Sequence, residues 1–138
     1  MTRRWWIALA VAAVTFGALD AVWLGVVARP LYAAGIGHLM APQPDVLAAG
    51  AFYVLFLVAL LYFVVRPNTS RTLRSRLTDA AFFGLVTYGT WDLTSRAVLR
   101  DFSWTVVIVD ILWGITAATV TTLVVDRVLT RVGPQQQE

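Results

Sequence analysis

The sequence predicts an all-α protein: a four-helix transmembrane bundle that forms a single domain over residues 1–138. Of its 138 residues, 59% are hydrophobic and only 14% are charged, whereas soluble domains are about half apolar and about a quarter charged. The apolar residues also gather in stretches of roughly 20 residues, the length that a helix needs to cross a bilayer. These observations exclude a disordered chain, a coiled coil and an ordinary soluble enzyme.

Three apolar stretches are long enough to cross a bilayer. The first covers residues 5–28 and contains one carboxylate, Asp20. The second covers residues 46–65 and carries no charge. The fourth helix in chain order covers residues 104–126, with Asp110 in its second turn. The sustained apolar character of each stretch predicts a membrane-spanning helix.

The third helix, residues 79–99, differs from the others, because its uncharged part from Ala80 to Trp91 is too short to span a bilayer. The distribution of arginine decides its topology, since cytoplasmic segments of membrane proteins are enriched in positive residues. Eight of the eleven basic residues flank the helices on one predicted side: Arg3, Arg4, Arg66, Arg71, Arg74, Arg76, Arg127 and Arg131. Both termini are therefore predicted to be cytoplasmic. That topology requires an even number of crossings, so residues 79–99 are predicted to span.

The connections between these helices are short. Residues 29–45 are predicted as the outer loop, in which residues 31–40 are compatible with a short interfacial helix. Tyr32 in this loop has the character of an interfacial belt residue. Residues 66–78 are predicted as a basic cytoplasmic loop, and residues 127–138 as a solvated tail. No linker divides the chain, which favours one domain.

Three carboxylates are predicted to lie at one depth, in the outer half of the bilayer. Asp20 and Asp92 fall past the midpoints of two outward-running helices, and Asp110 falls near the start of an inward-running one. At about 1.5 Å per residue, all three lie roughly one to two turns below the outer surface. Tyr53, in the second turn of the second helix, reaches a similar depth.

Small and aromatic residues share helical faces with these acids. On the third helix, Gly84, Tyr88, Asp92 and Arg96 recur every four residues and so form one stripe. Because small residues let helix backbones approach, we expect the acids to point into the bundle. The expected site consists of Asp20, Asp92, Asp110, Arg96, Tyr53, Tyr88, Trp23 and Trp113.

The energetic cost of these acids indicates a function. A charge at the centre of a membrane helix costs about 2.5–3.5 kcal/mol on insertion scales. Arg96 lies one turn after Asp92 and is expected to offset its charge, which leaves a surplus of negative charge. Such a site suits a proton, a cation or an amine. The preferred hypothesis is therefore the binding, with or without transport, of a small polar or cationic species.

Two other classes of function fit the same residues. A membrane enzyme acting on a lipid or isoprenoid substrate would use one Asp as an acid or base. A structural or assembly subunit would use the acids only as helix-packing locks, bonded across the bundle to Trp or Tyr. Two Asp-x-x-Trp segments, Asp20 to Trp23 and Asp110 to Trp113, suit such locks. Both alternatives stay open.

The sequence predicts no cofactor and no metal site, since it contains no cysteine and a single histidine, His38. The small net charge of +3 argues against a nucleic-acid partner. The expected partners are the lipid bilayer and a small-molecule, proton or cation ligand. Four helices are few for a transport path, which favours a homodimer or a partner membrane protein. The predicted location is the bacterial cytoplasmic membrane, crossed several times.

Four motifs spread over nearly the whole chain carry a resemblance. They are residues 19–25 (LDAVWLG), residues 52–53 (FY), residues 84–94 (GLVTYGTWDLT) and residues 109–114 (VDILWG). Together they resemble a bacterial family of four-helix membrane proteins that is defined as a domain of unknown function. The third-helix motif is the most specific, and here Trp91 and Ser95 stand where Tyr and Asn are usual. The resemblance implies the four-helix topology and no particular activity.

Overall fold

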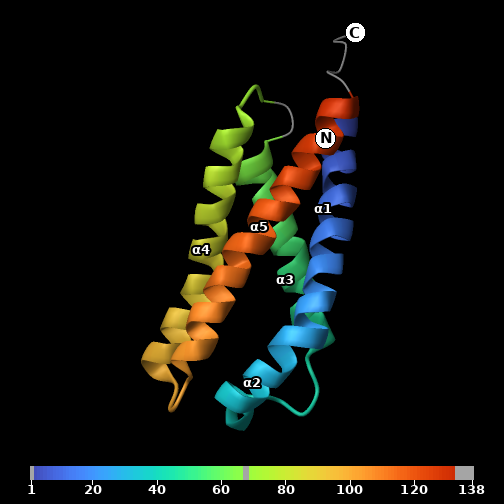
Figure 1. Cartoon of the computed structure of the whole chain (residues 1–138). Coiled ribbons are helices and arrows are strands. Elements are labelled where there is room, and N and C mark those ends of the chain that lie inside the picture. Colours follow the sequence, from blue (N-terminus) through green and yellow to red (C-terminus); the bar gives the residue numbers. More distant parts are fainter. Residues whose placement is uncertain (1, 67–68, 133–138) are drawn as a thin grey trace.

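The structure, a computed structural model, describes residues 2–66 and 69–132, which form helices and turns with no strand in those ranges. The predicted all-α class is confirmed. The helices run back and forth between the two ends of an elongated bundle (Figure 1). They are α1 (Arg3–Val22), α2 (Arg29–Ile36), α3 (Val46–Ala59), α4 (Leu73–Val98) and α5 (Trp104–Val132).

The first helix is longer than expected, and it bends. A π-helical segment, η1 (Trp23–Ala28), joins α1 directly to α2, and a short 3₁₀ turn, η2 (Gly37–Leu39), follows α2. The predicted outer loop over residues 29–45 therefore begins with a helix, which overlaps the range 31–40 that was compatible with a short helix. Pro30 at the start of α2 and the π-helical turn before it are usual causes of a sharp bend. α2 leans away from the line of α1 as a result (Figure 1).

The predicted basic loop 66–78 and tail 127–138 are both partly helical, because α4 begins at Leu73 and α5 continues to Val132. The second helix agrees with its prediction over residues 46–65, although it ends in a π-helical segment, η3 (Leu60–Val65). The last six residues of the predicted tail lie outside the described residues.

A buried ion pair joins the two extended helices. Arg76 of α4 and Asp126 of α5 are 7% and 6% exposed, with Nη1 and Oδ1 2.5 Å apart. Arg76 also donates to the carbonyl of Thr69 at 2.8 Å. A buried guanidinium needs such partners, because burial removes its water. Arg76 is therefore a packed residue, and only part of the predicted basic cluster faces solvent.

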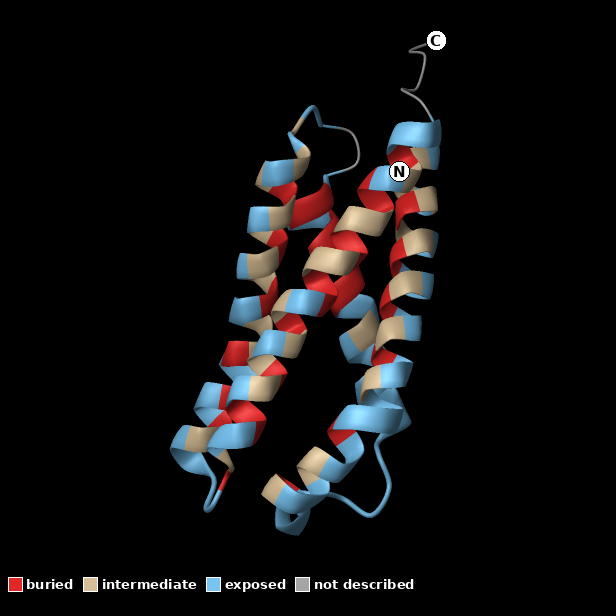
Figure 2. Ribbon diagram, viewed as in Figure 1, coloured by how far each residue is buried: buried red, intermediate tan, exposed pale blue. Residues whose placement is uncertain are grey.

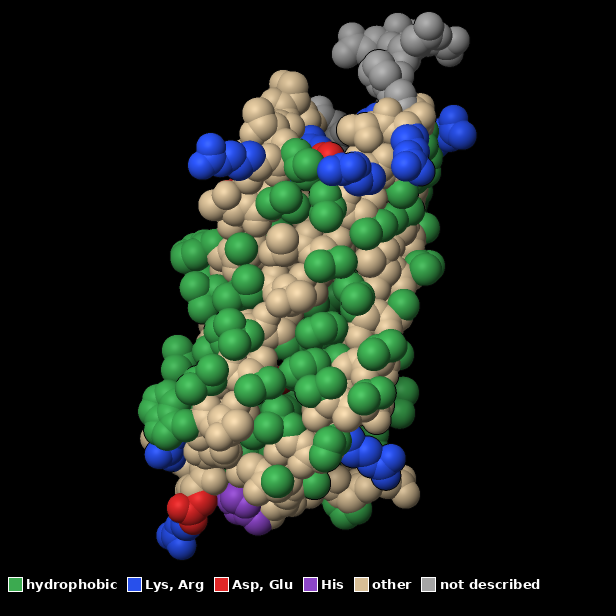
Figure 3. Space-filling model, in the orientation of Figure 1, with side chains coloured by type: hydrophobic (Ala, Val, Ile, Leu, Met, Phe, Trp, Pro, Cys, Tyr) green, Lys and Arg blue, Asp and Glu red, His purple; other side chains and the backbone are tan. Residues whose placement is uncertain are grey.

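Both chain ends lie at the same end of the bundle, together with the connection from α3 to α4 (Figure 1). On the face shown in Figure 3, charged side chains gather at the two ends of the bundle. The described residues contain three candidate membrane spans, Arg3–Leu39, Val46–Val65 and Trp104–Val132. α4 is about 39 Å long at about 1.5 Å per residue, which is enough to cross a bilayer, but its composition is less apolar.

α4 and α5 pack most closely in the bundle, and glycine permits it. Gly84 of α4 faces Gly114 of α5, and a Cβ at Gly84 would overlap the Gly114 backbone. A Cβ at Gly114 would overlap the ring of Tyr88. Small residues of this kind let membrane helices approach. The buried residues face the inside of the bundle (Figure 2), and Phe16 and Leu60 are among those fully enclosed.

Candidate functional site

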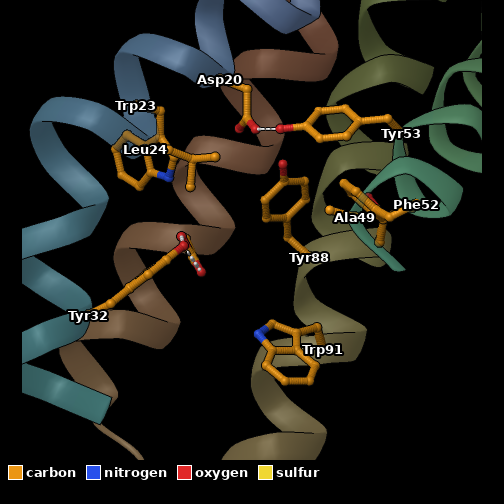
Figure 4. Close-up of a pocket in the computed structure, with 11 residues that line it drawn as sticks. Asp20, Trp23, Leu24, Tyr32, Ala49, Phe52, Tyr53, Tyr88 and Trp91 are labelled. Carbon is orange, nitrogen blue, oxygen red and sulfur yellow. Dashed lines mark hydrogen bonds between the residues drawn. The ribbon is translucent and has the colours of Figure 1, made fainter. Parts of the chain in front are cut away.

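A pocket of about 380 Å³ lies inside the bundle, beyond the midpoint of α1 (Figure 4). Each of the helices α1 to α5 contributes at least one side chain to its wall. The pocket is lined by Asp20, Trp23, Leu24, Tyr32, Ala49, Phe52, Tyr53, Thr87, Tyr88, Trp91 and Asp110. Five of the eight residues expected from the sequence therefore line one pocket: Asp20, Asp110, Tyr53, Tyr88 and Trp23.

Asp20 accepts hydrogen bonds from two other helices. The hydroxyl of Tyr53 on α3 donates to Oδ2, and the indole Nε1 of Trp113 on α5 donates to Oδ1 at 3.3 Å. Figure 4 shows Tyr53 reaching across the pocket to this carboxylate. Asp20 is only 7% exposed, so these donors replace most of the water that its oxygens would otherwise bind.

Asp110 has a partner that the sequence analysis missed. The hydroxyl of Tyr32 on α2 donates to both carboxylate oxygens, at 2.6 and 2.7 Å. From the sequence, Tyr32 was assigned to the interfacial belt and was not expected in the pocket, toward which the bent first helix turns it. The sequence gives only a weak indication that Tyr32 reaches the pocket. Predicting it requires the helix to continue past Pro30 instead of ending before that residue.

The two Asp-x-x-Trp segments meet in space. The indole rings of Trp23 and Trp113 are stacked, with centroids 4.6 Å apart and planes within 3° of parallel. Each segment therefore places its carboxylate on the pocket and its indole against the other indole. Trp113 supports the pocket through this stack and through its bond to Asp20, although it does not line the wall.

Tyr88 stands in the middle of the pocket wall. It comes from α4, is half-buried, and directs its hydroxyl toward Asp20 and Tyr53 in Figure 4. Its ring lies edge-on to Phe56, with centroids 6.3 Å apart. The close approach of Gly114 fixes the other side of the ring. The tight packing of α4 on α5 therefore positions one phenol of the site.

Asp92 and Arg96 lie apart from this pocket. Asp92 is fully buried and does not line the wall, and neither of its oxygens has a hydrogen-bond partner among the described residues. Arg96 lies over the ring of Trp104, 5.3 Å from its centroid, and its Nε is also unpartnered there. The expected ion pair between Asp92 and Arg96 is not formed.

Neither carboxylate of the pocket is paired with a cation from the described part of the chain. The ion pairs found in the described ranges lie near the end that holds the termini, and they involve neither Asp20 nor Asp110. The hydrogen-bond partners of Asp20 and Asp110 are neutral hydroxyl and indole groups. These donors satisfy the carboxylate oxygens without cancelling their negative charge. Within the same ranges no group of three or more metal-ligating side chains is found.

Apolar pocket residues also went unrecognised in the sequence. Leu24, Ala49, Phe52 and Trp91 line the wall, and each is exposed at the protein surface. Their sequence pattern is the same as that of any lipid-facing residue, so no local signal separates them from the rest of the apolar surface. Only the placement of η1, α3 and α4 around the pocket identifies them.

The fold and site together define a helical membrane protein with an acidic, aromatic-lined pocket inside its bundle. The chain belongs to the family described as "Predicted membrane protein (DUF2177)", whose model matches residues 5–125. The resemblance to a membrane family of unknown function is thereby confirmed. No curated protein and no solved structure matches the chain significantly.

Proposed function

We propose that this protein binds a small organic cation, such as an amine, in the pocket lined by Asp20 and Asp110. One observation carries the proposal: two buried carboxylates from different helices line the same pocket, and neither forms an ion pair within the described residues. An ammonium group between them would supply positive charge together with several N–H donors. Charge-assisted hydrogen bonds of this kind are stronger than neutral ones.

The aromatic wall supports the same choice of ligand. Trp23, Tyr88 and Trp91 present ring surfaces to the pocket, and a cation held over such a ring gains about 0.5–2 kcal/mol. The cavity volume of about 380 Å³ falls within the range of roughly 300–1,000 Å³ that is usual for small-molecule sites. Size and lining therefore both suit a small organic cation.

We further propose that the pocket lies in the outer half of the bacterial cytoplasmic membrane. The end that holds both termini also holds most of the arginine residues, and the positive-inside rule favours a cytoplasmic position for it. α4 runs between the same two ends as α5, which supports a fourth crossing. Three polar residues of α4, Arg76, Asp92 and Ser95, are buried and so would be shielded from lipid.

Native mass spectrometry of the protein in mild detergent tests the proposed binding. The wild type is expected to carry a co-purifying cation that the Asp20→Asn/Asp110→Asn variant loses, because an amide has no negative charge. Asp101→Asn is the matched control, since Asp101 is exposed outside the pocket and Asn tolerates its φ of 56°. Identical bound molecules in folded wild type and folded double variant would refute the proposal.

Structural locking is a second candidate, supported by the same hydrogen bonds. Tyr53 ties α3 to Asp20 of α1, and Tyr32 ties α2 to Asp110 of α5. Under this alternative, the double variant would unfold at a lower temperature while its bound molecules stayed the same. Measuring both quantities on the same preparations therefore separates the two functions.

A further inference from the structure

The pocket is acidic on one side and apolar at its rim. Asp20 and Asp110 are 7% and 4% exposed, whereas Phe52 of α3 and Trp91 of α4 are 44% and 57% exposed. Leu24 of η1 is a further exposed apolar residue of the rim. In Figure 4, Phe52 stands across the pocket from Asp20. A ligand that fills the whole pocket therefore meets charge at one side and apolar surface at the other.

The rim lies at a gap between α3 and α4. Within the described residues, no Cα atom of α3 lies within 8 Å of a Cα atom of α4. The two helices contact each other instead through aromatic rings. The ring centroid of Phe56 on α3 lies 5.4 Å from that of Phe83 and 6.3 Å from that of Tyr88. Phe56 is one turn farther along α3 than Phe52, toward the end that holds the termini. This aromatic layer joins α3 to α4 on that side of the rim, and beside it the pocket residues Phe52 and Trp91 are exposed.

The helix α3, on one side of this gap, faces the bilayer. α3 belongs to the uncharged candidate span Val46–Val65, and its outer residues Val54 and Leu55 are 65% and 70% exposed. Exposed apolar side chains in the middle of a membrane span contact lipid chains. A molecule that passes between α3 and α4 therefore comes from the hydrocarbon layer, and part of it has to be apolar.

We infer that the ligand is a single-chain amphiphilic amine that enters the pocket sideways from the bilayer, between α3 and α4. Its ammonium group binds Asp20 and Asp110, and its alkyl chain stays between Phe52 and Trp91. This inference rests on the proposed function and adds the chemical class of the ligand and its route. The cavity of about 380 Å³ restricts the inserted part to a small head group and the first portion of one chain.

Photolabelling in phosphatidylcholine nanodiscs tests this inference. The probe is dodecylamine with a diazirine in the first half of its alkyl chain, counted from the ammonium group. We expect the diazirine to label side chains of α3 and α4 beside the gap, with Phe52 and Trp91 among them. Labelling there should fall by at least about tenfold in the Asp20→Asn/Asp110→Asn variant, because the loss of even one charge-assisted hydrogen bond weakens binding by about that factor. Asp101→Asn should label as the wild type does.

Competition on the wild type makes the test independent of any variant. Unlabelled dodecylamine should abolish the labelling beside the gap, and dodecanol, which has the same chain without the charge, should leave it unchanged. Equal competition by dodecanol would overturn the inference, because the acids would then play no part in choosing the head group. Labelling spread evenly over the lipid-facing surface of all helices would overturn it as well.

Ethylamine, which has the same head group and almost no chain, separates this inference from the proposed function. Its binding is measured by titration calorimetry on the same nanodiscs, with wild type and double variant. If ethylamine binds in an acid-dependent manner and the dodecylamine probe does not label the gap, the sideways route is wrong and the cation site stands. If neither amine depends on the acids, both proposals fail.

Discussion

The Tyr32 hydroxyl donates to both oxygens of Asp110, at 2.6 and 2.7 Å, and so joins residues 78 positions apart in the chain. This contact depends on the bend at η1, which directs α2 toward the start of α5. Gly35 permits the close approach of α2 to the start of α5, because a Cβ there would lie 2.7 Å from a side-chain atom of Val106 and 2.9 Å from one of Ser103. The bend therefore brings one wall of the pocket into place.

Tyr32→Phe is expected to lower the free energy of unfolding by about 1–2 kcal/mol, since it removes the donor to Asp110 and keeps the ring. Equilibrium unfolding in mixed detergent micelles measures the change. Tyr62→Phe is the control, because Tyr62 is 63% exposed and lies outside the pocket. Equal stability of the two variants would show that the Tyr32 hydroxyl contributes nothing to the fold.

Gly84→Ala is expected to destabilise the bundle by about 1–3 kcal/mol, the usual range for overpacking, because the new methyl group would overlap the Gly114 backbone. Gly17→Ala makes the same change on α1, where a Cβ would meet nothing within 4 Å. That variant should be neutral or gain up to about 1 kcal/mol from helix propensity. Thermal unfolding followed by circular dichroism compares them, and similar melting temperatures would contradict the close packing of α4 on α5.

Arg76→Met should destabilise the protein by about 3–5 kcal/mol, because it leaves Asp126 buried without a cation. Arg76→Met/Asp126→Leu should recover most of that loss, since it removes both charges. Arg71→Met is the comparison, because its pair with Asp79 is partly exposed and should contribute less than about 1 kcal/mol. A double variant as unstable as Arg76→Met would show that the pair is not the cause.

Asp92→Asn is expected to leave the co-purifying molecules of the protein unchanged, because Asp92 does not line the pocket. Its melting temperature should be unchanged or higher, since the carboxylate is fully buried with no hydrogen-bond partner among the described residues. Native mass spectrometry and thermal unfolding of this variant provide the comparison with the Asp20→Asn/Asp110→Asn variant. Loss of the bound molecule from Asp92→Asn would place Asp92 in the binding site after all.

Much of the candidate site was predictable from the positions of residues along their helices. Asp20, Asp110 and Tyr53 were expected at one depth because each stands a known number of turns from the end of an apolar stretch, and all three line the pocket. Arg96 shows where such reasoning fails. Its spacing from Asp92 allowed an ion pair, but the guanidinium lies over Trp104, and the choice between two partners depends on side-chain packing.

Composition and the lengths of apolar stretches were sufficient for the all-helical membrane class, because the bilayer imposes one length and one polarity on every spanning segment. They were also sufficient to place the carboxylates along their helices. Tertiary structure decided which groups the carboxylates meet. Helix packing determines three features of the site: the bend that brings Tyr32 to Asp110, the stack of Trp23 on Trp113, and the gap between α3 and α4. Packing brings together residues that are far apart in the sequence, and no local sequence pattern indicates which residues these are.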